Sequence, residues 1–424
     1  MAAGPASNAD ESQLKPLRDH LSALEDRLSK DGAIGLVLVD VSPLLEIERL
    51  YGARPFRRTI EALATRIRSR IVQEVGNDFL IASGALEDEQ ILVFLQRDLG
   101  DSDFYSHDLP LLAQELRAYV AVCLKGIIYP YLYRAPDLPV GSGIGFNRPF
   151  HRIESQLRRL VNSTLRTAHF ELERCNRERA ATLERILLEE NVDSVFEPIV
   201  KLSEMKITGY EALSRGPTGT GLESPLNLFA IAESCGFEYE LDNLCRRQAL
   251  RNAKGIQPDQ KLFLNILPSS IHDPDFAGAR VREMLGDLGL APCNLVLEIS
   301  ERQAISNYPI FLEAIDHFSR LGFEIALDDT GAGFSSLEAA LELNPRYLKV
   351  DMSLVRGIEG NPQKQEAMRG LHSLSEKMSS TVIAEGIETR SELEVIQDLG
   401  IEYGQGFIFG RGGAVQADGV ARLA

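Results

Sequence analysis

The chain has 424 residues, of which 44% are hydrophobic and 25% are charged, a composition typical of globular proteins. Its formal net charge of −17 argues against non-specific binding to nucleic acid polymers or to an anionic membrane surface. The five cysteines show no CxxC spacing, and no stretch has the length and hydropathy of a signal peptide or a membrane span. We therefore expect a soluble, cytoplasmic protein.

The first part of the chain predicts a small α/β sandwich. Residues 1–30 are expected to form a polar tail followed by one helix. Residues 31–150 combine strand patterns with amphipathic helical spacing. The strand patterns lie at 34–41, 78–83, 90–95 and 139–146, and the helical spacing is clearest at 56–72 and 109–124.

Residues 151–190 are rich in charges of both signs and have the apolar spacing of one or two long helices. A helix that connects two domains is the simpler interpretation. A coiled-coil or signalling lever is the alternative that this pattern leaves open.

Residues 191–424 alternate strand patterns with helical patterns. Eight strands are expected within roughly 215 residues, at 194–200, 207–214, 261–267, 294–300, 323–329, 347–351, 381–387 and 403–410. Alternation of this number of βα units predicts a TIM-like (βα)8 barrel. The fold class is therefore α/β, with a barrel that follows a smaller sandwich domain.

Polar residues occupy the ends of the predicted strands, where βα barrels carry their active sites. One such residue alone would be a helix cap or a solvated strand end, but capping does not explain all eight strands together. The residues are Glu197, Glu211, Asn265, Glu298, the pair Asp328 and Asp329, Lys349 with Asp351, Glu385 and Gln405.

Asp328 and Asp329 end a buried strand although their charges repel each other, so a cation is expected beside them. A cluster of oxygen donors without Cys or His favours Mg²⁺ or Mn²⁺ over zinc. Adjacent aspartates can bridge two such ions, the arrangement used for in-line displacement at phosphorus. The residues therefore predict a two-metal site that acts on a phosphodiester.

Seven motifs between residues 190 and 412 resemble, in order, those of EAL-domain phosphodiesterases: GYEALSRGP, LFLNILP, LEISER, LDDTGAGFSSL, LKVDMSLV, VIAEGIET and YGQGFIFGR. The resemblance implies hydrolysis of cyclic di-GMP to linear pGpG with two Mg²⁺ or Mn²⁺ ions per active site. It also implies a homodimer formed through the barrel.

The resemblance also assigns roles to single residues. The metal ligands would be Glu211, Asn265, Glu298, Asp328, Asp329 and Glu385. The catalytic group would combine Glu211, Asp328, Asp329 and Glu385 with Lys349, which contacts the attacking water or the scissile phosphate. The substrate-binding residues would be Glu197, Leu213, Arg215, Asp242, Asp351, Glu388 and Gln405, and Glu301 would anchor the loop after Asp329.

Two positions depart from the family pattern. The family usually has Gln where this chain has Glu197, and commonly an aromatic residue where it has Thr330. Neither change removes a metal ligand. Glu197 is expected to weaken the binding of a dianionic substrate by like charge, and Thr330 to loosen the loop held by Glu301.

The N-terminal part resembles, more weakly, a GGDEF diguanylate cyclase domain. Its signature hairpin reads GALEDEQ, so if Asp88 and Glu89 align with the acidic pair, Leu86 and Glu87 replace both glycines. A tight turn against nucleotide phosphates does not tolerate those side chains. We therefore expect no cyclase activity and a regulatory or dimerising role.

Two alternatives to an enzyme follow from the same resemblance. The chain could be a silent cyclic di-GMP receptor that signals through a protein partner, or a scaffold without a ligand. Silent members of the family typically lack several acidic ligands, whereas this sequence keeps all of them. The intact ligand set favours the enzyme.

Overall fold

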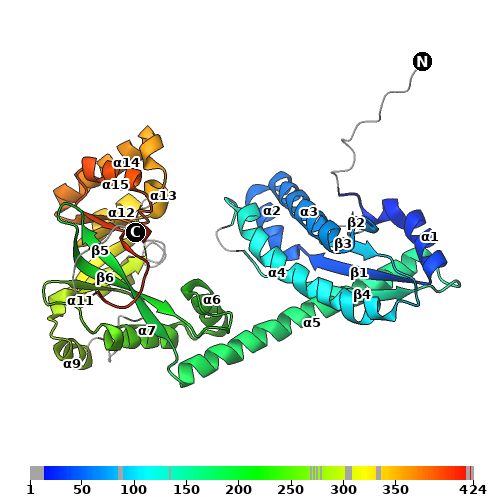
Figure 1. Cartoon of the computed structure of the whole chain (residues 1–424), viewed down its shortest axis with the longest axis horizontal. Coiled ribbons are helices and arrows are strands. Elements are labelled where there is room, and N and C mark those ends of the chain that lie inside the picture. Colours follow the sequence, from blue (N-terminus) through cyan, green and yellow to red (C-terminus); the bar gives the residue numbers. More distant parts are fainter. Residues whose placement is uncertain are drawn as a thin grey trace, which may run out of the picture. The chain divides into compact units, whose positions relative to one another are not determined.

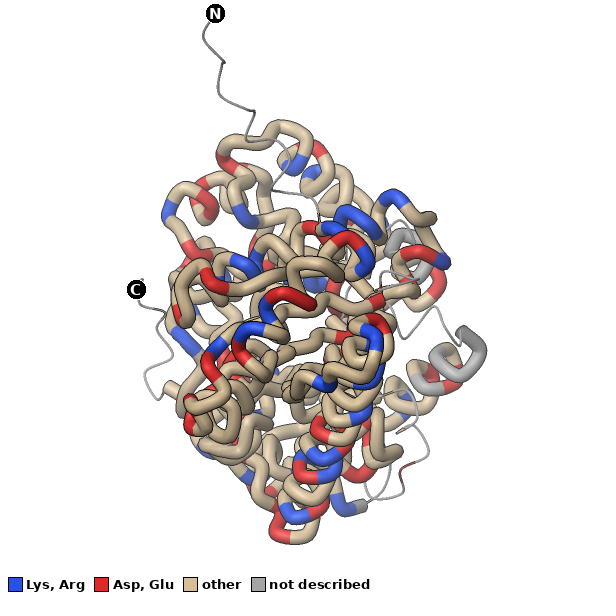
Figure 2. The backbone as a smooth tube through the Cα atoms, turned by 90° about the vertical axis from the view of Figure 1, so that its right-hand side faces the viewer, with Lys and Arg blue, Asp and Glu red and all other residues tan. Residues whose placement is uncertain are grey.

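The computed structural model describes residues 14–84, 89–132, 135–267, 270, 273, 276, 279–300, 308–330, 336–416 and 421. The chain divides into two compact units, residues 1–178 and 179–424 (Figure 1). No helix in these described ranges is both long and apolar enough to cross a membrane. In the view of Figure 2, acidic and basic positions are interspersed along most elements, as is typical of solvated surfaces.

The first unit is built on a four-stranded antiparallel sheet of order β2-β3-β1-β4. Its strands are β1 (Ala33–Asp40), β2 (Phe79–Ser83), β3 (Gln90–Leu95) and β4 (Val140–Phe146). Every residue of β1 is buried, because helices cover both faces of the sheet. The continuous apolar run of this strand reflects that double burial.

The two faces of the sheet pack on different helices. Val37 and Val39 face α3 (Ala53–Val75) and α4 (Leu109–Ile128) in one apolar cluster. Leu36 and Leu38 face α1 (Leu21–Asp31) and the start of α5 (Ile153–Leu188) in another. The short helix α2 (Leu45–Tyr51) joins the α3 side. The side-chain period of two on β1 thus separates the two clusters.

Helix α5 is one continuous helix of 36 residues. Its first part packs on the sheet of the first unit, and its last residues, Leu183 and Ile186, belong to a core cluster of the second unit. The sequence predicts one or two connecting helices over residues 151–190, and the structure has one helix over Ile153–Leu188. His169 on α5 lies 2.8 Å from the buried Asp40 at the end of β1, measured from Nε2 to Oδ2.

Three alternating glycines on β4 bring α5 close to the sheet. A Cβ atom at Gly143 would lie 2.1 Å from Thr164 Oγ1, and one at Gly145 would lie 3.0 Å from the Leu160 side chain. At Gly141 the obstacle is helix backbone, because the Cβ would lie 2.7 Å from the amide nitrogen of Ala168. Backbone cannot rotate aside, so Gly141 requires the absence of a side chain.

Gly141→Ala is therefore expected to destabilise the first unit by about 1–3 kcal/mol, the usual cost of overpacking a core. The free energy of unfolding by urea would measure this loss. The matched control is Gly126→Ala on α4, where a Cβ meets nothing within 4 Å and replacing a helical glycine is neutral or stabilising by up to about 1 kcal/mol. Equal stability of the two variants would contradict the close contact between α5 and β4.

The second unit is a closed barrel of eight strands, which confirms the barrel and its strand count. The strands are β5 (Asp193–Lys201), β6 (Lys206–Arg215), β7 (Lys261–Asn265), β8 (Leu295–Ser300), β9 (Glu324–Thr330), β10 (Tyr347–Val350), β11 (Thr381–Ala384) and β12 (Tyr403–Gln405). The helices are α6 (Pro225–Cys235), α7 (Glu238–Asn252), α9 (Ala279–Asp287), α11 (Tyr308–Arg320), α12 (Ser336–Leu343), α13 (Met352–Val355), α14 (Pro362–Met378) and α15 (Arg390–Asp398).

The first strand of the barrel runs against all the others. β5 pairs antiparallel with both β6 and β12, whereas β6 to β12 pair in parallel. The expectation that every strand presents a polar residue at its carboxyl end is therefore wrong for β5. Glu197 lies in the middle of β5, directly opposite Glu211 on β6.

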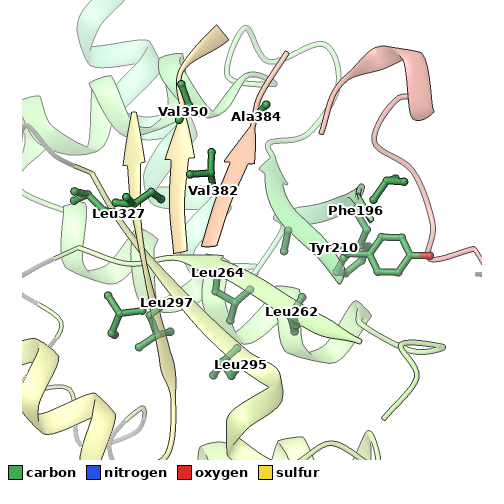
Figure 3. Close-up of a cluster of buried hydrophobic side chains, with 14 of the residues drawn as sticks. Phe196, Tyr210, Leu262, Leu264, Leu295, Leu297, Leu327, Val350, Val382 and Ala384 are labelled. Atoms are coloured by element: carbon green, nitrogen blue, oxygen red, sulfur yellow. The ribbon is translucent and has the colours of Figure 1, made fainter. Parts of the chain in front are cut away.

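Alternating residues of the barrel strands form two apolar layers. Side chains such as Leu262, Leu264 and Leu297 point outward and make the large core cluster between strands and helices (Figure 3). The residues between them point inward and fill the barrel interior, and these are Ile199, Phe263, Val296, Ala326, Tyr347 and Ile383. The interior is therefore a packed floor, as in other βα barrels.

Candidate metal centre and active site

The polar residues of the predicted site form a layer directly next to the apolar floor of the barrel, toward the carboxyl ends of the parallel strands. On each parallel strand the inward floor residue is followed, two positions later, by an inward polar residue. These pairs are Gly209 and Glu211, Phe263 and Asn265, Val296 and Glu298, Ala326 and Asp328, Tyr347 and Lys349, Ile383 and Glu385, and Tyr403 and Gln405. On the reversed strand β5 the order is inverted, so Glu197 precedes Ile199.

Lys349 is the central cation of this layer. Its side chain is 1% exposed, and its Nζ atom contacts carboxylates on three other strands and one directly after β11. The distances are 2.7 Å to Glu298 and to Glu385, 3.1 Å to Glu211 and 3.4 Å to Asp328. Without this ammonium group the buried carboxylates would face one another uncompensated.

Two amides hold Glu211 in position. The Asn265 Nδ2 atom donates to Glu211 Oε1 at 3.3 Å and to Glu298 Oε2 at 3.1 Å. The Gln405 Nε2 atom donates to Glu211 Oε2 at 2.6 Å. Strands β6, β7, β8 and β12 are thereby connected through side chains, and a substrate contact of Gln405 stays a prediction.

A bulge in β9 explains how two consecutive aspartates share one site. Leu327 pairs with Leu348 and Thr330 pairs with Val350, so Asp328 and Asp329 together face the single position of Lys349. Asp329 has a φ of 59°, in the left-handed region that non-glycine residues rarely adopt. Successive side chains of a regular strand point to opposite faces, and the bulge cancels that alternation here.

As a result, oxygen atoms of Asp328, Asp329 and Glu385 lie within 4.8 Å of one another, a group that could hold a metal ion. Backbone strain of this kind is typical of functional sites, where the surrounding structure compensates for it.

The charges of the layer shift the pKa values of its members. Burial would lower the pKa of Lys349, but the four carboxylates outweigh it and raise that pKa well above its usual range. Burial, followed by neighbouring negative charge, raises the pKa of Glu298 well above normal, and burial likewise raises that of Glu385. Burial opposes ionisation of Glu211 too, but Lys349 and Gln405 outweigh it and lower its pKa. The layer is thus short of positive charge.

The residues fit divalent metal ions. The donors are carboxylate and amide oxygens, which Mg²⁺ and Mn²⁺ prefer. Among the described atoms, the buried Gln405 Oε1 accepts no hydrogen bond, and Asp328 Oδ1 accepts none either, although Lys349 Nζ lies 3.4 Å from it. Each therefore has an acceptor position available. A cation would also relieve the raised pKa values of Glu298 and Glu385, because metal binding favours deprotonated ligands.

A cleft of about 480 Å³ opens beside the carboxylates. Its polar side includes Asn265, Glu298 and Asp329, and its apolar side includes Leu213 on β6 and Phe229 on α6. An apolar wall beside convergent polar groups is typical of small-molecule sites.

Some of the other residues predicted to bind substrate already have partners within the protein. Asp242 lines the cleft, but its carboxylate is held by Arg246 at 2.9 Å and by the Ser270 hydroxyl at 2.6 Å. Asp351 caps α13 by accepting from the Ser353 amide at 2.9 Å. Roles of Asp242 and Asp351 toward a substrate stay predictions.

Glu388 forms an ion pair with Arg356, and Arg215 donates to the Ser214 carbonyl at 2.9 Å. Substrate contacts of Glu388 and Arg215 also stay predictions. Glu301 lies outside the described residues, as do Asp88 and the two positions before it in the N-terminal hairpin. Thr330 is buried at the end of the bulge.

Sequence reasoning missed the wall that α6 contributes to the cleft, and on α7 it identified Asp242 alone. Leu226, Phe229 and Arg246 line it, but apolar residues on an amphipathic helix carry no signal that separates a cleft wall from core. On α7 the available signal was charge on a buried face, because Arg246 lies one turn after Asp242 and pairs with it.

A family model described as the EAL domain matches residues 180–412, more than half of the chain. This chain belongs to the EAL domain family. The match covers the whole carboxylate layer and the cleft of the EAL domain described above.

Curated relatives are similar mainly across the EAL domain. Cyclic di-GMP phosphodiesterase NbdA of Pseudomonas aeruginosa is 28% identical over 54% of this chain and 30% of its own length. Probable cyclic di-GMP phosphodiesterase PdeG of Escherichia coli is 29% identical over 50% of this chain and 43% of its own length. An uncharacterized signaling protein of Caulobacter vibrioides is 29% identical over 95% of this chain. The chain spans half or less of the length of these relatives.

Solved structures show the same fold. The EAL domain of Xanthomonas citri FimX, in complex with c-diGMP, superimposes with a TM-score of 0.52 and 21% identity over 58% of this chain and 97% of that chain. The EAL enzyme Bd1971, in its cAMP-bound form, gives a TM-score of 0.51 and 27% identity over 62% of this chain and 73% of that chain.

Proposed function

We propose that this chain hydrolyses cyclic di-GMP to linear pGpG in a metal-dependent reaction. The observation that carries the proposal is the complete set of five carboxylates, one amide and one lysine that meets above the barrel floor. Relatives named as cyclic di-GMP phosphodiesterases support the choice of substrate.

The metal ligands in this proposal are Glu211, Asn265, Glu298, Asp328, Asp329 and Glu385. When bound, two Mg²⁺ or Mn²⁺ ions would polarise the phosphodiester and lower the pKa of the attacking water. The site without metal carries more carboxylates than cationic side chains, so it repels a substrate with two negative phosphodiesters. Substrate binding is therefore expected to depend on metal.

The remaining residues orient the substrate. Lys349 keeps its proton, because its pKa is raised, and so supplies a fixed positive charge beside the scissile phosphate. Arg215 would bind a phosphate oxygen, and the cleft wall with Leu213 and Phe229 would accept a guanine base. Such preorganised charge and positioning are the main sources of catalysis at phosphorus.

For the first unit we propose a regulatory role without cyclase activity, in the manner of a degenerate GGDEF domain. The missing glycines at Leu86 and Glu87 are the reason. A homodimer through the barrel and an unidentified protein partner are also proposed.

Glu197 is expected to limit affinity for the substrate. It faces Glu211 across the β5–β6 pair, and burial followed by the charge of Glu211 raises its pKa. Glu197→Gln should tighten binding by about 1 kcal/mol, because one negative charge opposite Glu211 is removed. The Michaelis constant measures this effect, with the exposed Glu204→Gln as a control of equal charge change. An unchanged constant in Glu197→Gln would place its side chain away from the ligand.

The full chain incubated with cyclic di-GMP tests the proposed function. Linear pGpG should appear by chromatography with Mg²⁺ or Mn²⁺, disappear on addition of a chelator, and return when metal is restored in excess. Hydrolysis that persists in the chelator would overturn the metal dependence.

A further inference from the structure

A second cavity lies in the first unit, away from the carboxylate layer. It has a volume of about 320 Å³ and opens between the end of β4, the start of α5 and the last turns of α1. Its floor is apolar, with Leu28 from α1, Ile34 from β1 and Leu157 from α5. Nothing in the proposed phosphodiesterase reaction uses this cavity.

Cationic side chains from two elements surround the cavity. Arg148 precedes α5 in the chain, whereas Arg159 and Arg166 are seven residues apart and therefore share one face of α5. His151 joins them at the rim. Among the described lining residues there is no carboxylate, although the whole chain carries a net charge of −17.

Two arginines farther along the same helix form ion pairs, whereas those of the cavity do not. Arg174 pairs with Glu171 and Glu178, and Arg177 pairs with Glu173. Within the described part of the chain, Arg148, Arg159 and Arg166 have no carboxylate partner within ion-pair distance. Intrahelical carboxylates therefore neutralise the first group, whereas the second group is available to an anionic ligand.

The loop that carries Arg148 and His151 is fixed in place. The Gln156 side chain accepts a hydrogen bond from the Arg148 amide at 2.8 Å and donates to the Arg148 and His151 carbonyls at 3.0 and 2.9 Å. These three bonds tie the loop to the first turn of α5. The backbone of Arg148 and His151 is thus fixed beside the cavity, which lowers part of the entropy cost of binding.

The cavity also has an aromatic edge. Phe146, at the end of β4, lines it and is 56% exposed, and the neighbouring Ile144 is 37% exposed. An exposed aromatic ring beside guanidinium groups suits a ligand that combines a planar ring with phosphate groups, because the ring stacks while the arginines bind phosphate oxygens. The volume lies at the lower end of the range for small-molecule sites.

We propose that this cavity, defined by Arg148, Arg159, Arg166 and Phe146, binds a nucleoside polyphosphate. The arginines bind the phosphate groups, and Phe146 stacks on the base. An inorganic polyphosphate would contact the arginines but would not stack on Phe146. Substitution of the arginines should therefore weaken both ligands, whereas substitution of Phe146 should weaken only the nucleotide.

Calorimetric titration of the full chain tests the proposal, with ATP, pyrophosphate and adenosine as probes. A chelator in the buffer keeps metal out of the carboxylate layer, which then repels phosphates. The wild type should bind ATP at one site per chain, pyrophosphate more weakly and adenosine not measurably. The triple variant Arg148→Gln/Arg159→Gln/Arg166→Gln should weaken ATP binding by at least about tenfold.

Two controls make the result specific. A second triple variant, Arg54→Gln/Arg58→Gln/Arg66→Gln, removes the same charge from α3 outside the cavity and should keep wild-type affinity. Phe146→Ala should weaken ATP but leave pyrophosphate unchanged. The proposal is overturned if wild type binds no phosphate probe at millimolar concentration, or if both triple variants lose affinity equally. Equal effects of Phe146→Ala on ATP and pyrophosphate would overturn the nucleoside part.

Discussion

Asp328→Asn is expected to reduce turnover of cyclic di-GMP by several orders of magnitude while the barrel stays folded. Asp328 lies in the bulge of β9, within reach of Asp329, Glu385 and Lys349. Its loss removes a charged ligand from the centre of the proposed metal site, so charge stabilisation and positioning both fail. The amide occupies nearly the same volume and relieves repulsion with the neighbouring carboxylates, so stability should be unchanged or higher.

Product formation and a thermal melt, measured on the same preparations, check this prediction. Asp259→Asn is the matched control, because Asp259 is exposed and pairs with Lys206 at the surface of the same unit. It should keep wild-type turnover. Turnover of Asp328→Asn within tenfold of wild type would remove Asp328 from the reaction.

Lys349→Met is expected to destabilise the metal-free protein by about 3–5 kcal/mol, the usual cost of leaving a buried charge cluster uncompensated. Four carboxylates lose their shared cation, and two of them, Glu298 and Glu385, already have raised pKa values. A carboxyl group whose pKa is raised by folding destabilises the folded state at high pH. That penalty is lost as the pH falls through the folded pKa. The deficit should therefore shrink on acidification.

Thermal melts in chelator, at a mildly alkaline and a mildly acidic pH, measure the deficit. Lys377→Met on the exposed end of α14 serves as the control and should melt like the wild type. Added Mn²⁺ or Mg²⁺ should restore part of the stability of Lys349→Met, since a divalent ion replaces the missing charge. A Lys349→Met variant that melts with the wild type in chelator would contradict the buried cluster.

The eight strands and the polar layer could be predicted because both depend on local patterns. Each parallel strand has an apolar floor residue two positions before its polar residue, as Phe263 precedes Asn265 and Val296 precedes Glu298. Such spacing is visible in the chain itself, since the side chains of a strand alternate with a period of two. The resemblance to the EAL family rested on the same residues.

The direction of β5 and the bulge of β9 could not be predicted in this way. The direction of a strand depends on which neighbours it pairs with. The residue pattern around Glu197 is compatible with a parallel and with an antiparallel strand. The bulge depends on the register between β9 and β10. The sequence shows that Asp328 and Asp329 are adjacent, but it does not show how both side chains reach one site. The cleft wall on α6 and the arginine cavity likewise arise from packing between distant segments.

The most direct test of the central claim measures binding and hydrolysis of cyclic di-GMP in one sample. The wild-type full chain, with Mg²⁺ or Mn²⁺, is incubated with labelled cyclic di-GMP, and bound nucleotide is separated by filtration and identified by chromatography. We expect the label to pass to linear pGpG with repeated turnover, and Asp328→Asn to leave cyclic di-GMP intact. Wild-type protein that retains labelled cyclic di-GMP but forms no pGpG would contradict the proposed hydrolysis and favour a receptor that signals through a protein partner.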